Sequence, residues 1–104
     1  MALHCPATLL VAPTPRDAQG VDELAASLTG ERVLAVVRPP GDPMGGRLAD
    51  LLDVPIEDEG GLAAADPPPS VLGEIADLHH GETVVVLMPP DSVGEPPFDR
   101  REVD

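Results

Sequence analysis

Three short runs of consecutive apolar residues stand out along the chain, and each predicts a buried β-strand. The runs are Thr8–Ala12, Val33–Val37 and Thr83–Met88. Their apolar positions are continuous, which is typical of parallel strands buried on both faces. The absence of polar alternation in Thr83–Met88 predicts a central place for it in the sheet.

A first helix is predicted between the first two runs. Asp17 is a suitable N-cap, and Gly30 ends the segment. Between these two positions apolar residues recur at the spacing of an amphipathic helix, namely Val21, Leu24, Ala25 and Leu28.

Two further helices are predicted downstream. Gly41–Gly46 has the composition of a flexible loop, and the second helix follows it. Ser70 is a suitable N-cap for the third helix, which Gly81 ends. The apolar residues that mark these helices are Leu48, Leu51 and Leu52 in the second, and Val71, Leu72, Ile75 and Leu78, which we expect to face the core, in the third.

The order of these elements predicts an α/β fold. With Val54–Glu57 as a brief extended segment, the chain reads β-α-β-α-(β)-α-β. Right-handed crossovers turn this order into a sheet with helices on both faces. We therefore predict a three-layer α/β/α sandwich with a small, mostly parallel sheet of three to four strands. Residues 1–90 would form this single domain, and residues 91–104 a flexible acidic, proline-rich tail.

Length and composition limit the class of protein. A chain of 104 residues is one domain, and Phe98 is its only aromatic residue, so the core must consist of small aliphatic side chains. Cys5 is the only cysteine, which excludes an intrachain disulfide and a thiolate metal cluster. Residues 1–12 lack a basic leader and a long apolar stretch. We expect a cytoplasmic protein.

The net charge of the chain limits the kinds of partner that it can bind. The formal net charge is -13, from 19 carboxylates and 6 basic residues, all of them arginine. This field repels phosphate backbones and anionic lipids, so we expect no direct binding to nucleic acid or membrane. A basic protein partner is compatible with the charge, although an acidic surface also simply keeps a small domain in solution.

The segments after the apolar runs carry prolines where an α/β protein normally places its chemistry. They are Pro13-Thr14-Pro15, Arg38-Pro39-Pro40 and Pro89-Pro90. Ligands usually bind at the carboxyl ends of the strands in an open α/β sheet, and a proline side chain can transfer no proton there. The pattern predicts no catalytic residue and no cofactor.

Several segments resemble the histidine phosphatase superfamily, which has the phosphoglycerate mutase-like fold. Val71–Val86, with its Gly-Glu-Thr turn, is similar to a helix and the final strand of that family. Leu34–Pro40 and Arg47–Glu57 are similar to the second strand and the following helix. The resemblance covers residues 7–90 and implies the same α/β scaffold.

The residues that this family uses for phosphoryl transfer are replaced. Where the resemblance implies an Arg-His-Gly triplet, the chain has Ala12, Pro13 and Thr14, and the second histidine position is Pro89. A further arginine would fall within Gly41–Gly46, which contains none. Because proline can neither accept a phosphoryl group nor bind its oxygens, the resemblance implies a shortened pseudoenzyme.

We therefore expect a non-catalytic binding, regulatory or adaptor module that acts through protein-protein contacts. A truncated scaffold leaves a sheet edge or helix face uncovered, which favours a homodimer. The alternative is a phosphoesterase or a small-anion binding protein, in which Arg16, Arg38 and Arg47 converge near the strand ends on phosphate or a nucleotide. Such arginines are also typical surface counter-charges.

No metal site is predicted from the remaining ionisable residues. His79 and His80 point in different directions from a helix end, which favours a solvated helix terminus. Glu57-Asp58-Glu59 lacks the alternating ligands of a calcium loop and predicts a solvated acidic turn. His4 and Cys5 are expected at a frayed end, and Gly41–Gly46 lacks the lysine and hydroxyl of a phosphate-binding loop.

Overall fold

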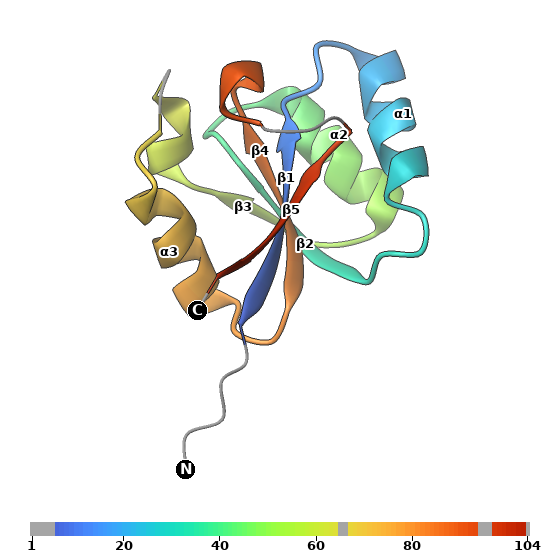
Figure 1. The fold of residues 1–104 in the computed structure, drawn as a ribbon. Coiled ribbons are helices and arrows are strands. Elements are labelled where there is room, and N and C mark those ends of the chain that lie inside the picture. Colours follow the sequence, from blue (N-terminus) through green and yellow to red (C-terminus); the bar gives the residue numbers. More distant parts are fainter. Residues whose placement is uncertain (1–5, 65–66, 94–96, 104) are drawn as a thin grey trace.

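Five strands form one sheet in the order β3-β2-β4-β1-β5 in the computed structural model of the chain (Figure 1). The structure describes residues 6–64, 67–93 and 97–103. The elements, in chain order, are β1 (Ala7–Pro13), α1 (Ala18–Ser27), β2 (Val33–Arg38), α2 (Pro43–Leu52), β3 (Ile56–Asp58), the 3-10 helix η1 (Gly60–Ala63), α3 (Ser70–Leu78), β4 (Thr83–Met88), the 3-10 helix η2 (Pro90–Ser92) and β5 (Asp99–Val103).

The helices cover both faces of this sheet, as the element order predicts. Helices α1 and α2 lie together on one face, and α3 lies on the other (Figure 1). Strands β1, β2, β3 and β4 are parallel, and β5 runs antiparallel to β1. The α/β class and the three-layer arrangement are confirmed, and β4 lies between β2 and β1, at the centre of the sheet.

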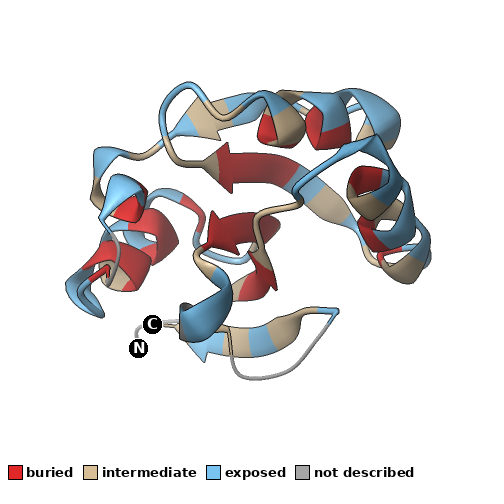
Figure 2. Ribbon diagram, turned by 90° about the horizontal axis from the view of Figure 1, so that it is seen from above, coloured by how far each residue is buried: buried red, intermediate tan, exposed pale blue. Residues whose placement is uncertain are grey.

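The continuous apolar runs supply both layers of the core because successive residues of a strand point to opposite faces. In β4, Val84 and Val86 pack under α3, whereas Val85 and Leu87 pack under α1 and α2. Figure 2 shows the buried residues on the central strands and on the helix surfaces that face them. A strand that is buried on both faces cannot alternate with polar residues, which is why β4 reads as an unbroken apolar segment.

The sequence predicts the start of α1 correctly but not the start of α2. Asp17 caps α1 as predicted, and its carboxylate accepts a hydrogen bond from the Gly20 amide at 2.8 Å. The predicted loop Gly41–Gly46 is wrong from Pro43 onward, because α2 begins there. Proline at the first helical position is favourable, and the Asp42 carboxylate accepts bonds from two amides of the first turn. These two signals outweigh the low helix propensity of the glycines.

Two predictions for α3 are also wrong. Ser70 makes no capping hydrogen bond, because the helix is already entered at Pro69 and Ser70 lies inside it. Leu78 does not face the core and is 74% exposed. The buried stripe runs instead through Leu72, Ile75 and His79, at intervals of three and four residues, so His79 takes the place assigned to Leu78.

The sheet has five strands rather than three or four, because part of the predicted tail pairs with β1. Residues 99–103 form β5, in which Asp99 lies opposite Val11 and Val103 opposite Ala7. Its side chains alternate between exposed and half-buried positions, so this charged edge strand lacks the apolar run that identified the others. The predicted tail also contains residues of η2, which ends at Ser92. The predictions for His4, Cys5 and tail residues 94–96 and 104 lie outside the described residues.

Candidate functional site

A hollow of about 530 Å³ lies at the carboxyl ends of β1 and β4, beside the first turn of α1. Prolines form much of its wall, namely Pro13, Pro15, Pro90 and Pro97. Its ionisable side chains are Arg16, Asp17 and Glu23. The position matches the edge at which α/β proteins usually bind ligands.

The register of the sheet brings together, beside this hollow, the two prolines that stand where the resemblance implies histidines. Pro13 lies opposite Met88, so Pro89 follows at the adjacent strand end. Thr14 joins the two strand ends, since its amide donates to the Met88 carbonyl at 3.0 Å and its hydroxyl lies 3.3 Å from the same oxygen. The Thr14 hydroxyl therefore serves to hold the strand ends together, just as the Asp17 carboxylate serves to cap α1.

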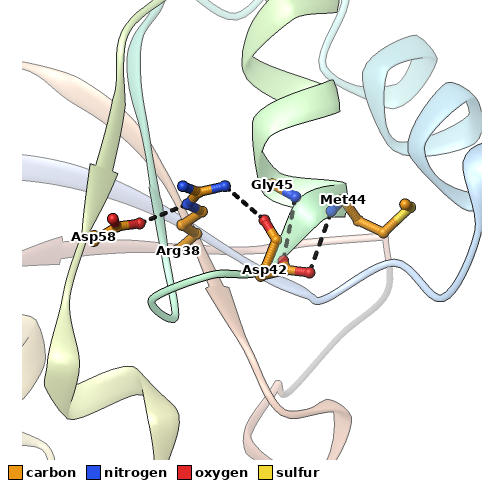
Figure 3. A network of polar contacts seen from close by, with 5 residues as sticks. All are labelled: Arg38, Asp42, Met44, Gly45 and Asp58. Carbon is orange, nitrogen blue, oxygen red and sulfur yellow. Dashed lines mark hydrogen bonds and ion pairs between the residues drawn. The ribbon is translucent and has the colours of Figure 1, made fainter.

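Arg38, the last residue of β2, is held between two other segments (Figure 3). Its Nε donates to the Asp58 carboxylate on β3 at 2.5 Å, and its Nη1 donates to the Asp42 carbonyl at 2.7 Å. Glycine at position 45 permits this approach, because a Cβ there would lie 2.9 Å from the Arg38 Cβ. Arg38 therefore ties β2 to β3 and to the start of α2, and its charge is already matched by a carboxylate.

The three candidate arginines lie in different environments. Arg16 lines the hollow, Arg38 is engaged with Asp58, and Arg47 is exposed on α2. Of the three, only Arg16 belongs to the lining of the hollow. Arg38 is half-buried and its charge is matched by Asp58, so Arg16 is the candidate for contact with a bound group.

A buried histidine forms a second polar cluster on the α3 face. His79 is 7% exposed, and its Nε2 lies 3.0 Å from the Glu57 carboxylate on β3. Its Nδ1 lies 2.8 Å from the carboxylate of Glu82, in the turn before β4. The prediction of a solvated helix terminus is therefore wrong for His79, whereas His80 beside it is exposed.

The two carboxylates determine the protonation of this ring. Burial lowers the pKa of His79, but the hydrogen bonds and the negative charges of Glu57 and Glu82 together outweigh burial and raise the pKa above its ordinary value of 6.5. The charged imidazole can donate from both ring nitrogens, one to each carboxylate. It therefore links β3, α3 and the start of β4.

The prediction of a solvated acidic turn at Glu57-Asp58-Glu59 is correct only in part. The Glu57 and Asp58 side chains remain 39% and 51% exposed, but both residues belong to β3 and all three carboxylates have partners. Glu57 contacts His79, Asp58 contacts Arg38, and Glu59 accepts a hydrogen bond from the Gly61 amide at 3.1 Å. Successive side chains of a strand point to opposite faces, so adjacent carboxylates reach partners on different layers. These partners are 20 and 22 residues away for Asp58 and Glu57, a separation that no local pattern reveals.

Two signals in the sequence could have indicated these clusters. His79 continues the helical stripe of Leu72 and Ile75, which predicts burial. The pair Gly45-Gly46 inside a helix is typical of close packing, and here the Arg38 side chain occupies the space.

No group of three or more histidine, cysteine or acidic side chains within residues 6–64, 67–93 and 97–103 is arranged to hold a metal ion. None of the helices in this part of the chain has the length and hydropathy needed to cross a membrane. No protein-family model, curated protein or solved structure matches the chain.

Proposed function

We propose that this chain is a non-catalytic binding module that contacts a partner protein through the hollow at the carboxyl ends of β1 and β4. The observation that carries the proposal is that three polar side chains at this edge already hold parts of the fold together. Thr14 is bonded to the Met88 carbonyl, Asp17 caps α1 and Arg38 is paired with Asp58. Each of these groups has a structural partner, and four prolines form much of the wall of the hollow.

The resemblance to the histidine phosphatase superfamily supports this proposal in one respect. The positions that it assigns to the two histidines are Pro13 and Pro89, and they lie at adjacent strand ends beside the hollow. A scaffold with these positions replaced keeps the place of a former active site as a surface for binding. We propose a shortened pseudoenzyme on this basis.

Charge selects the kind of partner that this surface fits. The net charge of -13 attracts basic proteins and accelerates their association. Glu23 and Asp17 line the hollow together with one arginine, so its local charge is also negative. We propose a basic, extended segment of a partner protein as the occupant.

The test is capture from an extract of the native host with matched charge-reversal variants. Glu23→Arg changes the hollow, whereas Glu74→Arg changes an exposed position on α3, on the other face of the sheet. One stoichiometric protein should bind the unmodified chain and the Glu74→Arg variant, and binding to Glu23→Arg should be at least about tenfold weaker. Equal binding to all three proteins, or phosphoester turnover that Arg38→Ala abolishes, would contradict the proposal.

A small-anion binding protein is the second candidate, and the position of Arg16 favours it. Arg16 lines the hollow, and Arg47 is a matched control because it is also an exposed arginine but lies on α2. Titration with inorganic phosphate or a nucleotide should then shift the amide signals of residues 14 and 16–20. Arg16→Ala should abolish the shift, and Arg47→Ala should leave it unchanged. An unchanged spectrum at millimolar ligand would eliminate this candidate.

The homodimer remains a prediction, and two features of the chain act on it in opposite directions. Large apolar side chains are exposed at Leu34, Leu51 and Ile56, near one end of the sheet order. The net charge of -13 on each copy opposes association at low ionic strength. If a dimer forms, light scattering should detect it and added salt should strengthen it; a monomer at high concentration and high salt would exclude it.

A further inference from the structure

The edge strand β3 is held by side chains on both of its faces. Glu57 contacts His79 on the α3 face, and Asp58 contacts Arg38 on the α2 face. The strand itself contains only three residues. A ladder this short contributes few hydrogen bonds, so the two side-chain contacts carry a large share of its attachment.

The two contacts respond differently to pH. Arginine does not lose its charge near neutral pH, so the Arg38–Asp58 contact is permanent in that range. A histidine loses one of its two ring protons near neutral pH. A neutral ring has one donor, yet Glu57 and Glu82 are both acceptors when ionised, so one carboxylate must face an unprotonated nitrogen.

We propose that His79 is a proton-controlled clamp on the edge strand β3, which holds Glu57 when both ring nitrogens are protonated and releases it when one proton is lost. Glu57 is the carboxylate that leaves because its partner is 22 residues away and joins two separate elements. Glu82 stays, since its contact spans three residues and the Glu82 amide also donates to the His79 carbonyl at 2.9 Å.

The charged groups around the ring agree with this assignment. Glu57 approaches from β3 and Glu82 from the turn before β4, at 3.0 and 2.8 Å. On the helix itself the neighbouring Asp77 lies 3.6 Å from His80, and both side chains are exposed. Because the pKa of His79 is raised above 6.5, the clamp is complete below that pH and opens as pH rises through the higher value.

Opening β3 has a structural consequence for β2. The β2 edge pairs with β3 through Val36 and Arg38, whose amide and carbonyl groups contact Pro55 and Glu59. When β3 loosens, these two backbone hydrogen bonds open more often, so the amides that donate them exchange faster with solvent. The inference concerns a different edge from the hollow and does not depend on the proposed function.

Hydrogen exchange across the His79 titration tests the clamp. The Val36 and Glu59 amides report on the β2–β3 ladder, and the Thr14 amide, which bonds to Met88, reports on the β1–β4 strand pair. Protection factors corrected for intrinsic exchange should fall about tenfold at Val36 and Glu59 as the imidazole nitrogen shifts report loss of the proton from His79. Protection at Thr14 should stay constant.

Three variants make the test specific. Glu57→Gln and Glu82→Gln each replace one acceptor by an amide that can also donate, so the neutral ring no longer has two competing acceptors. Both should keep Val36 and Glu59 protected at every pH, whereas the exposed control His80→Gln should show the unmodified fall. Constant protection in the unmodified chain, a persistent fall in both glutamine variants, or loss of the fall in His80→Gln would each overturn the proposal.

Discussion

Strand β5 closes one edge of the sheet with five residues in an antiparallel ladder, whereas β3 closes the other edge with three residues in parallel. The β5 edge depends mainly on its backbone, because every residue of the strand has a partner on β1. The β3 edge depends on side chains, through His79 on one face and Arg38 on the other. Two edges of one sheet can therefore reach stability by different means, and only the side-chain route depends on pH.

Removal of β5 should cause the largest loss of stability at either edge of the sheet. A chain that ends at Phe98 loses the whole antiparallel ladder and the contact of Val103 with the core. Several hydrogen bonds of about 1 kcal/mol each are lost, so we expect the free energy of unfolding to fall by at least about 3 kcal/mol. Urea denaturation followed by far-ultraviolet circular dichroism measures this, since the chain has no tryptophan or tyrosine.

The control for this truncation is Arg100→Ala, which removes only the ion pair between Arg100 and Glu31. An exposed pair of this kind contributes less than about 1 kcal/mol. If Arg100→Ala destabilises the protein as much as the truncation does, the ladder is not what holds the β5 edge.

A methyl group at position 45 should have the second largest effect, and it acts on the β3 edge. The Cβ of Gly45→Ala would lie 2.9 Å from the Arg38 Cβ and 3.2 Å from Leu87 Cδ1. Such overpacking typically costs about 1 to 3 kcal/mol, and displacement of Arg38 also weakens its bond to Asp58. Gly73→Ala is the matched control, because its Cβ meets no atom within 4 Å and alanine favours a helix. The thermal unfolding midpoint should be lowest for Gly45→Ala, intermediate for the unmodified chain and highest for Gly73→Ala. Equal midpoints for the two variants would refute the packing role of Gly45.

The sequence predicted the central strands well because their signal is physical and local. Burial on both faces requires consecutive apolar side chains, and β1, β2 and β4 all show them. The edge strand β5 was not predicted, because its exposed face requires charged residues such as Arg100 and Glu102. The N-cap at Asp17 could also be predicted from the sequence, since the residue and the amide that it binds are three positions apart.

The candidate site was harder to predict because its contacts join distant segments. A hollow lined by Pro13, Pro90 and Pro97 exists only after the sheet brings these positions together. The burial of His79 also depends on Glu57, which makes the desolvation of the ring tolerable by matching its charge. Sequence patterns identified the prolines and the acidic residues. Which prolines meet at the hollow, and which partners the carboxylates contact, follows from the tertiary fold.

Removal of the Glu57 carboxylate should have a smaller effect, and one that depends on pH. His79 has a raised pKa, so the bond stabilises the folded state fully below 6.5 and loses this contribution as pH rises through the higher folded value. Glu57→Ala should therefore cost about 1 kcal/mol in slightly acidic solution, since the side chain is partly exposed, and close to nothing in alkaline solution. Urea titrations at a series of pH values measure the difference, and a cost that grows with pH would contradict the direction.

Loss of the Asp58 charge should have the smallest effect. The Asp58 side chain is 51% exposed, so solvent screens its bond to Arg38 even though the arginine is only 20% exposed. Asp58→Asn keeps a hydrogen-bond acceptor and removes only the charge, and we expect a cost of about 0.5 kcal/mol that does not change across neutral pH. Added salt should reduce this cost further, because screening weakens a solvent-exposed pair. If Asp58→Asn instead reproduced the pH-dependent loss expected for Glu57→Ala, the two faces of β3 would not act independently, and the contrast between the permanent and the proton-controlled contact would fail.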